Sequence, residues 1–194
     1  MVITWNGNNY FKLQSGDLVV LVDPDNQRSF KGAAVALHTL RPARTERPPE
    51  DSGEASLFWV DHQGEYEANG VRVHGYHTEG DGKVEKTAYR LTFDDLAVGV
   101  LGHLTKDLDP KVQGELAGVD ILIVPAGGSP YLSPAAVAKI VRQIEPSAII
   151  PGLGENTKPL LKELGQANAA PSDRYTVKKK DLTPKAMVVQ VLTV

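Results

Sequence analysis

The second half of the chain alternates proline-capped helix starts with short, largely apolar runs. Asp109-Pro110 and Ser133-Pro134 each place an N-cap acceptor directly before a proline, an arrangement typical of the first turn of a helix. Apolar residues then recur at helical spacing up to about Ile144, where Glu145-Pro146 ends the pattern. This alternation predicts an α/β fold. Helices are expected over residues 109–117, 133–144 and 157–164, and strands over 119–124, 148–150 and 187–192.

Short β-type runs dominate the first hundred residues. Residues 18–22 (LVVLV) are a continuous apolar run, as expected for a strand covered on both faces. Residues 6–9 (NGNN) are a hairpin-turn signal, and Asp94-Asp95 is another turn between two predicted strands. Further strands are expected over residues 33–37, 57–60, 71–73, 87–93 and 97–101.

Length and composition favour one soluble domain over residues 1–194. Hydrophobic residues make up 41% of the 194 residues, which is enough for a substantial core. The net charge of -3 gives no field that would attract nucleic acid or an anionic membrane, so neither is expected as a partner. The chain has no cysteine, which excludes thiolate metal sites, and no run approaches the roughly 18 apolar residues of a membrane helix. We therefore expect a cytoplasmic protein.

The segment 41–56 differs from the rest of the chain. It is rich in proline, glutamate, arginine and serine and shows no hydrophobic periodicity. Loops of this length are usually functional or disordered. We therefore expect a mobile loop over residues 41–56.

Six segments, in order along the chain, resemble the metallo-β-lactamase superfamily, and in particular its small hydrolases similar to ascorbate-phosphate lactonases. They are residues 3–11 (ITWNGNNYF) with 22–24 (VDP), 64–71 (GEYEANGV), 101–104 (LGHL), 119–128 (VDILIVPAGG), 145–151 (EPSAIIP) and the closing 175–192. The resemblance implies an α/β fold of the metallo-β-lactamase type, a four-layer αββα sandwich. It also implies that residues 175–192 form a closing hairpin.

The metal ligands of this family are mostly replaced. Active members bind one or two metals through a His-x-His-x-Asp-His motif, two further histidines and a bridging aspartate, and the metal activates a water molecule. The corresponding positions here are His38, Leu40, Pro42, Ala43, Gly80, His103 and Leu153. Only the two histidines of these seven can coordinate a metal. The resemblance therefore implies no catalytic residues, and neither a metal nor another cofactor is expected.

Several polar residues remain near the old ligand positions. Asn8 stands where the family opening has a histidine. Asp23-Pro24 resembles a family pair whose aspartate orients a metal-binding residue without itself binding the metal. His38 ends an apolar strand, where a hydrogen-bonded structural histidine is the simpler interpretation, and His103 follows a strand at the expected cleft rim. The remaining cleft is expected to be lined by Asn8, Asp23, His38, His77, Asp81 and His103.

Three functional hypotheses follow. The first is a non-catalytic homologue whose cleft or surface binds a small ligand or a protein partner. The second is a metal-dependent hydrolase with a rebuilt single-metal site, in which His38 and His103 would hold weakly bound zinc or another divalent metal. The third is a structural or assembly subunit, with the cleft closed by apolar residues such as Leu40 and Leu153. The sequence leaves open whether the chain is an enzyme.

Overall fold

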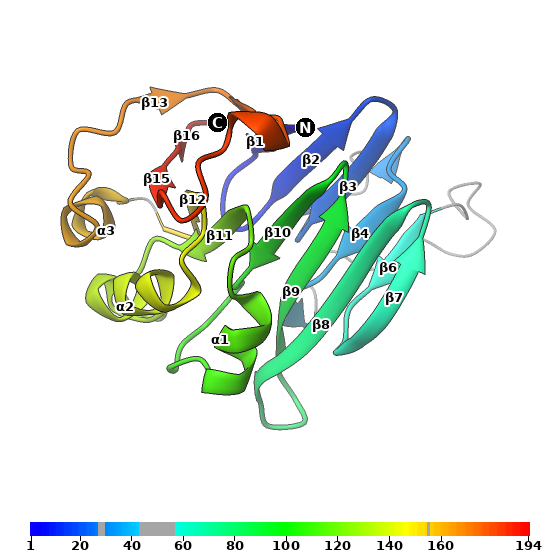
Figure 1. Ribbon diagram of the computed structural model, residues 1–194. Coiled ribbons are helices and arrows are strands. Elements are labelled where there is room, and N and C mark those ends of the chain that lie inside the picture. The colour runs from blue at the N-terminus through cyan, green and yellow to red at the C-terminus, as the bar shows by residue number, and fades with distance from the viewer. Residues whose placement is uncertain (27–29, 43–56, 155) are drawn as a thin grey trace.

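In the computed structural model, which describes residues 1–26, 30–42, 57–154 and 156–194, two β-sheets pack face to face (Figure 1). The predicted α/β sandwich is confirmed. Of the sequence expectations, the loop over 41–56 is the one that falls largely outside the described residues. Its first residue, Arg41, belongs to a short strand rather than to a loop.

The first sheet has six described strands. In spatial order they are β14 (Tyr175–Thr176), β1 (Val2–Trp5), β2 (Phe11–Ser15), β3 (Leu18–Val22), β4 (Val35–Leu37) and β6 (Phe58–Val60). The predicted turn over residues 6–9 joins β1 to β2, and Tyr10 N–H donates to the carbonyl of Gly7 over 2.9 Å. Strands β3, β4 and β6 are parallel, so their carboxyl ends lie at one edge of the sheet.

The second sheet has eight described strands. In spatial order they are β15 (Val188–Val189), β12 (Ala148–Gly152), β11 (Ile121–Pro125), β10 (Leu96–Val100), β9 (Glu85–Phe93), β8 (Val71–Gly80) and β7 (Gly64–Ala68), with β5 (Leu40–Arg41) paired to the start of β9. Strands β10, β11 and β12 are parallel. The predicted Asp94-Asp95 turn joins β9 to β10, and both residues adopt positive φ as that turn requires.

Both predicted helix starts are confirmed. Helix α1 (Pro110–Leu116) begins after Asp109, whose side chain accepts from Lys111 N–H over 2.7 Å. Helix α2 (Pro134–Ile144) begins after Ser133, whose hydroxyl accepts from Ala136 N–H over 3.3 Å. The third helix, α3, spans Lys158–Glu163. No described helix has the length and apolar character that crossing a bilayer requires.

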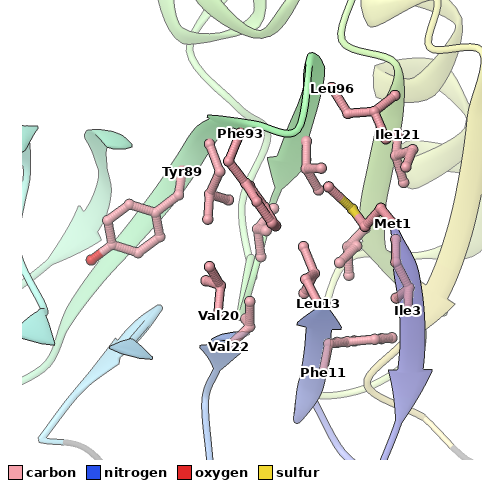
Figure 2. Packing of buried hydrophobic residues seen from close by; sticks show 14 of the residues in the cluster. Met1, Ile3, Phe11, Leu13, Val20, Val22, Tyr89, Phe93, Leu96 and Ile121 are labelled. Carbon is pink, nitrogen blue, oxygen red and sulfur yellow. The ribbon is translucent and has the colours of Figure 1, made fainter. Parts of the chain in front are cut away.

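The main core lies between the two sheets. Side chains from β1, β2 and β3 point into the same space as those from β9, β10 and β11 (Figure 2). Phe11, Leu13 and Tyr89 are among the largest of these, and all three are fully buried. Each side chain of this size contributes about 1.5–3 kcal/mol by leaving water, so the inter-sheet core is the main reason that the sheets hold their mutual position.

A second core covers the outer face of the eight-stranded sheet. Leu122 and Ile149 point outward from that sheet and pack against Val141 of α2 and Leu160 of α3. All three described α-helices lie on this side (Figure 1). Over the outer face of the six-stranded sheet, the covering layer within the described residues is the short segment around Phe30.

The predicted closing hairpin over 175–192 is wrong. Strand β14 pairs with β1 of the first sheet, and β15 pairs with β12 of the second. A 3-10 turn over Lys179–Asp181 lies between them, and Lys179 binds the carboxylate of Asp120 at 2.6 Å. The C-terminal segment therefore bridges the two sheets. The last strand of this segment, β16 (Val191–Leu192), pairs separately with β13 (Pro171–Ser172), which precedes the segment.

Candidate functional site

A pocket of about 210 Å³ opens where the carboxyl ends of parallel strands from both sheets meet. The residues that line it are two amides, two carboxylates, two imidazoles, three apolar side chains and one phenol. They are Asn8, Asn9, Asp23, Asp25, His38, His103, Pro24, Leu40, Leu153 and Tyr131.

The topology brings these residues together from distant parts of the sequence. Asp23 directly follows β3, His38 directly follows β4, and His103 follows β10. Asn8 comes from the turn between β1 and β2, and Leu153 directly follows β12. Ligand sites of α/β proteins commonly lie at this carboxyl edge, because the loops there converge.

The pocket rim contains backbone that non-glycine residues rarely adopt. Asn8, Asp23 and Leu153 have φ angles of 49°, 43° and 42°. Asparagine and aspartate tolerate the left-handed region, whereas leucine is strained there by about 1–3 kcal/mol. Leu153 is held in place because its N–H donates to the carbonyl of Asn8 over 2.9 Å and its side chain is buried. The strain therefore lies directly against the pocket.

Behind the pocket lies a chain of short hydrogen bonds centred on Thr39, which is completely buried. Its hydroxyl donates to Asp23 Oδ2 over 2.5 Å, and its N–H donates to Asp23 Oδ1 over 2.7 Å. His103 Nδ1 lies 2.8 Å from the same hydroxyl oxygen. Asn9 Nδ2 lies 2.5 Å from Asp23 Oδ2 and 3.3 Å from Thr39 Oγ1. Asp23 thus lines the pocket and at the same time orients Thr39 and Asn9.

This network determines which nitrogen of His103 carries a proton. A carboxylate without a proton can only accept, so the hydroxyl hydrogen of Thr39 points to Asp23. The hydroxyl oxygen must then accept from His103, and Nδ1 is the donor. In the neutral imidazole, Nε2 is therefore the hydrogen-bond acceptor. The contact of Nδ1 with Thr39 determines this tautomer, because only one of the two ring nitrogens carries a proton in the neutral form.

His38 is packed as a structural residue. It is 4% exposed, its carbonyl accepts from Tyr89 Oη over 2.9 Å, and its ring lies 4.9 Å from the ring of Trp59. Burial raises the pKa of Tyr89 well above its ordinary range, so that hydroxyl remains a donor. These contacts support a packing role for His38, which also lines the pocket.

His77 and Asp81 do not line this pocket, contrary to the expectation from the sequence. The segment that carries them does not form a cleft loop, because β8 continues through residues 77–80 and pairs with the start of β9. His77 instead lies 3.2 Å from Glu85 and lines a separate surface hollow beside α1. Asp81 lies at the exposed hairpin tip, where it accepts from the N–H groups of Lys83 and Val84 over 2.8 Å.

The same hairpin holds the loop that carries His103. Glu79 accepts from the N–H groups of Thr105 and Lys106 over 2.6 and 2.9 Å, from the Thr105 hydroxyl, and from Lys86 Nζ over 3.0 Å. Burial alone would raise the pKa of this carboxyl, but the hydrogen bonds outweigh burial and lower the pKa to about 2. Glu79 thus fixes the β10–α1 loop two residues beyond His103.

The donor set of the pocket fits a metal ion poorly. Both carboxylate oxygens of Asp23 already accept hydrogen bonds from Thr39, and Nδ1 of His103 donates to the same residue, so only Nε2 of that imidazole could coordinate a metal. In the described part of the chain, no three histidine, aspartate or glutamate side chains form a group that could hold a metal ion. Leu40 and Leu153 line the pocket at two of the positions where the family resemblance implies ligands, and leucine cannot coordinate.

Of the six residues that the sequence predicts for the cleft, the structure brings Asn8, Asp23, His38 and His103 to one pocket, together with others that the sequence did not predict. Thr39 was overlooked, although it directly follows His38 at the end of a buried strand, where side chains turn toward the same edge. Asn9 belongs to the predicted turn over residues 6–9, and nothing in that pattern distinguishes it from Asn8 as a pocket residue. Asp25 and Tyr131 carry no local pattern that would have marked them.

Comparisons with known proteins agree with this architecture. Residues 2–152 match a family model described as the β-lactamase superfamily domain. A protein from Thermotoga maritima, provisionally described as a zinc-dependent hydrolase of the metallo-β-lactamase superfamily, is similar in structure with a TM-score of 0.73 at 21% identity, over 98% of this chain and 97% of that one. The metallo-β-lactamase fold protein YhfI from Bacillus subtilis has a TM-score of 0.63 at 10% identity, over 99% and 95%. Igni18, a metallo hydrolase from Ignicoccus hospitalis, has a TM-score of 0.62 at 13% identity, over 98% and 94%.

No curated protein sequence matches the chain. At these identities the similar structures establish the fold alone. The family model covers more than half of the chain, and the chain belongs to the metallo-β-lactamase superfamily.

Proposed function

We propose that this member of the metallo-β-lactamase superfamily is a non-catalytic homologue whose pocket binds a small molecule. The family is one of metal-dependent hydrolases, in which a metal supplies the activated water. The proposal departs from that chemistry because the resemblance implies that most of the metal ligands are replaced, and because Asp23 accepts hydrogen bonds from Thr39 and Asn9.

One observation carries the proposal. The carboxylate of Asp23, which lies 3.7 Å from His103 Nδ1, already accepts three hydrogen bonds from Thr39 and Asn9. A metal bound to Asp23 would compete with these bonds, and no group of three histidine or carboxylate side chains that could complete a catalytic zinc site lies together in the described part of the chain. The pocket nevertheless keeps polar groups that require partners, which supports binding over a purely structural role.

A second function is supported by the placement of the two remaining histidines. His38 and His103 line the same pocket, as a single-metal hydrolase would require. That alternative predicts that hydrolysis depends on both residues together and on added divalent metal.

Hydrolysis assays distinguish the two functions. Lactones, phosphodiesters and β-lactams are offered to the purified protein, with and without added zinc or manganese. We expect turnover at the background rate. The control is His74→Ala, which removes an exposed imidazole that lies outside the pocket and so tests for loosely bound surface metal. Turnover that survives in His74→Ala and disappears in the His38→Ala, His103→Ala double variant would overturn the proposal.

A further inference from the structure

We infer that the ligand of this pocket is a small organic cation, a protonated amine attached to an apolar group. The inference rests on the proposed binding function and names the chemical class of the ligand. It follows from an unpaired acceptor, from the charge of the lining residues and from the shape of the apolar walls.

The unpaired acceptor is the side-chain oxygen of Asn9. Asn9 is 2% exposed and lines the pocket, and its Oδ1 has no hydrogen-bond partner in the described part of the chain. The orientation of the amide is determined by its neighbours. Nδ2 lies within 2.5 Å of Asp23 Oδ2 and 3.3 Å of Thr39 Oγ1, and both of these oxygens accept at that contact. The NH₂ group therefore faces the network, and Oδ1 requires a donor from elsewhere.

The charge of the lining favours a cation. Asp23 and Asp25 bring two carboxylates to the pocket, and no lysine or arginine is among the described residues that line it. An anionic ligand would face both carboxylates without a compensating positive group, and like charges at contact distance disfavour binding. A neutral donor would satisfy Asn9 but would gain nothing from the carboxylates. A protonated amine would donate a hydrogen bond to Asn9 Oδ1 and would also be attracted by the two carboxylates.

The rest of the wall is apolar. Pro24, Leu40 and Leu153 line the pocket with the ring of Tyr131, whose centroid lies 6.0 Å from that of His103. The volume of about 210 Å³ equals that of about seven water molecules at about 30 Å³ each, so it admits one ring with a short side arm. An aromatic ring at this wall also matches the flat faces of Tyr131 and His103.

The experiment compares three probes that share a benzene ring and differ in charge. Benzylamine is protonated at pH 7, benzyl alcohol is a neutral donor, and benzoate is an anion. Each is titrated into ¹⁵N-labelled protein, and the shifts of the Asn9 side-chain amide and the Leu153 backbone amide are followed. We expect benzylamine to move both signals with a dissociation constant on the order of 1 mM, and benzoate to bind at least about tenfold more weakly.

A matched pair of variants tests the role of charge. Asp25→Asn removes the carboxylate at the rim, whereas Asp17→Asn makes the same change in the exposed β2–β3 turn, at the far end of the strands from the pocket. Asp25→Asn should weaken benzylamine by about two- to fivefold, and Asp17→Asn should leave it unchanged.

The outcomes separate the inference from the function on which it rests. If benzyl alcohol or benzoate moves the pocket signals as strongly as benzylamine, the pocket binds ligands but the cationic class is wrong. If no probe moves them, or if both aspartate variants behave alike, the inference is overturned. Pocket-dependent hydrolysis in the assays above would overturn the non-catalytic function itself, whatever the probes show.

Discussion

Thr39→Val is the substitution that most sharply tests the network behind the pocket. Valine has nearly the same shape as threonine, so the packing around this fully buried side chain is largely preserved. The hydroxyl is lost, and with it the 2.5 Å bond to Asp23, the 2.8 Å bond from His103 and the weaker contact from Asn9.

The expected cost follows from what is left unpaired. A hydrogen bond to a charged group contributes about 1.5–3 kcal/mol, and an unsatisfied buried donor costs about 1–3 kcal/mol more. Asp23 keeps the Thr39 N–H and the Asn9 amide, so part of its stabilisation remains. We therefore expect Thr39→Val to lower the free energy of unfolding by about 2–4 kcal/mol.

Urea unfolding at pH 7, followed by circular dichroism, measures this change. Thr39→Ser retains the hydroxyl and loses only a methyl group, so it should cost about 0.5–1.5 kcal/mol. Thr183→Val repeats the chemical change at an exposed site and should stay within about 0.5 kcal/mol of the unmodified protein. If the valine and serine variants at position 39 are equally stable, the hydroxyl does not organise the site and the assigned tautomer of His103 loses its basis.

Two further predictions concern residues that position the loops around the pocket. Glu79→Gln should lower the free energy of unfolding at pH 7 by up to about 3 kcal/mol, because the folded-state pKa of about 2 lies below the unfolded value of about 4.3. As the pH falls, the unfolded chain binds the proton first, so this stabilisation is complete above about pH 4.3 and is lost as the pH falls towards 2. Urea unfolding at pH 7 and at pH 3 measures the difference in stability between Glu79→Gln and the unmodified protein, with Glu67→Gln as the exposed control. A difference that does not shrink at pH 3 would refute the prediction. Gly102→Ala should cost at least about 2 kcal/mol, since a Cβ there would lie 2.4 Å from Thr39 Cβ and φ is +63°. Gly70→Ala has φ of +78° and open space around it, so it isolates the backbone term, and equal thermal melting of the two variants would contradict the packing argument.

Local chemistry explains which elements could be predicted from the sequence. Asp109, Ser133 and the Asp94-Asp95 turn act through neighbours within three residues, so their patterns were sufficient. The convergence of Asp23, His38 and His103 was also predictable, because each directly follows a strand or lies within three residues of its end. For these three residues, the strand pattern predicts that each lies near the end of a strand. The family resemblance was needed only to predict that those strand ends lie close together in space.

The remaining features depend on contacts that no local pattern records. Whether residues 77–81 form a cleft loop or continue as strand depends on pairing with Glu85–Phe93, and a β-bulge after His77 changes the register there. The hydrogen bonds of Thr39 reach residues 16 and 64 positions away along the chain. Such partners are determined by the packing of the two sheets, which is why the sequence indicated the pocket but not the network behind it.

The central claim is that the pocket has exchanged a metal site for an organic ligand site. Elemental analysis of protein purified without added metal or chelator, after dialysis, tests this claim most directly. The account predicts zinc, iron and manganese far below one ion per chain, because both oxygens of Asp23 accept hydrogen bonds from Thr39 and no group of three histidine or carboxylate side chains that could hold a metal lies together in the described part of the chain. A near-stoichiometric metal that is lost in the His38→Ala, His103→Ala double variant would contradict it.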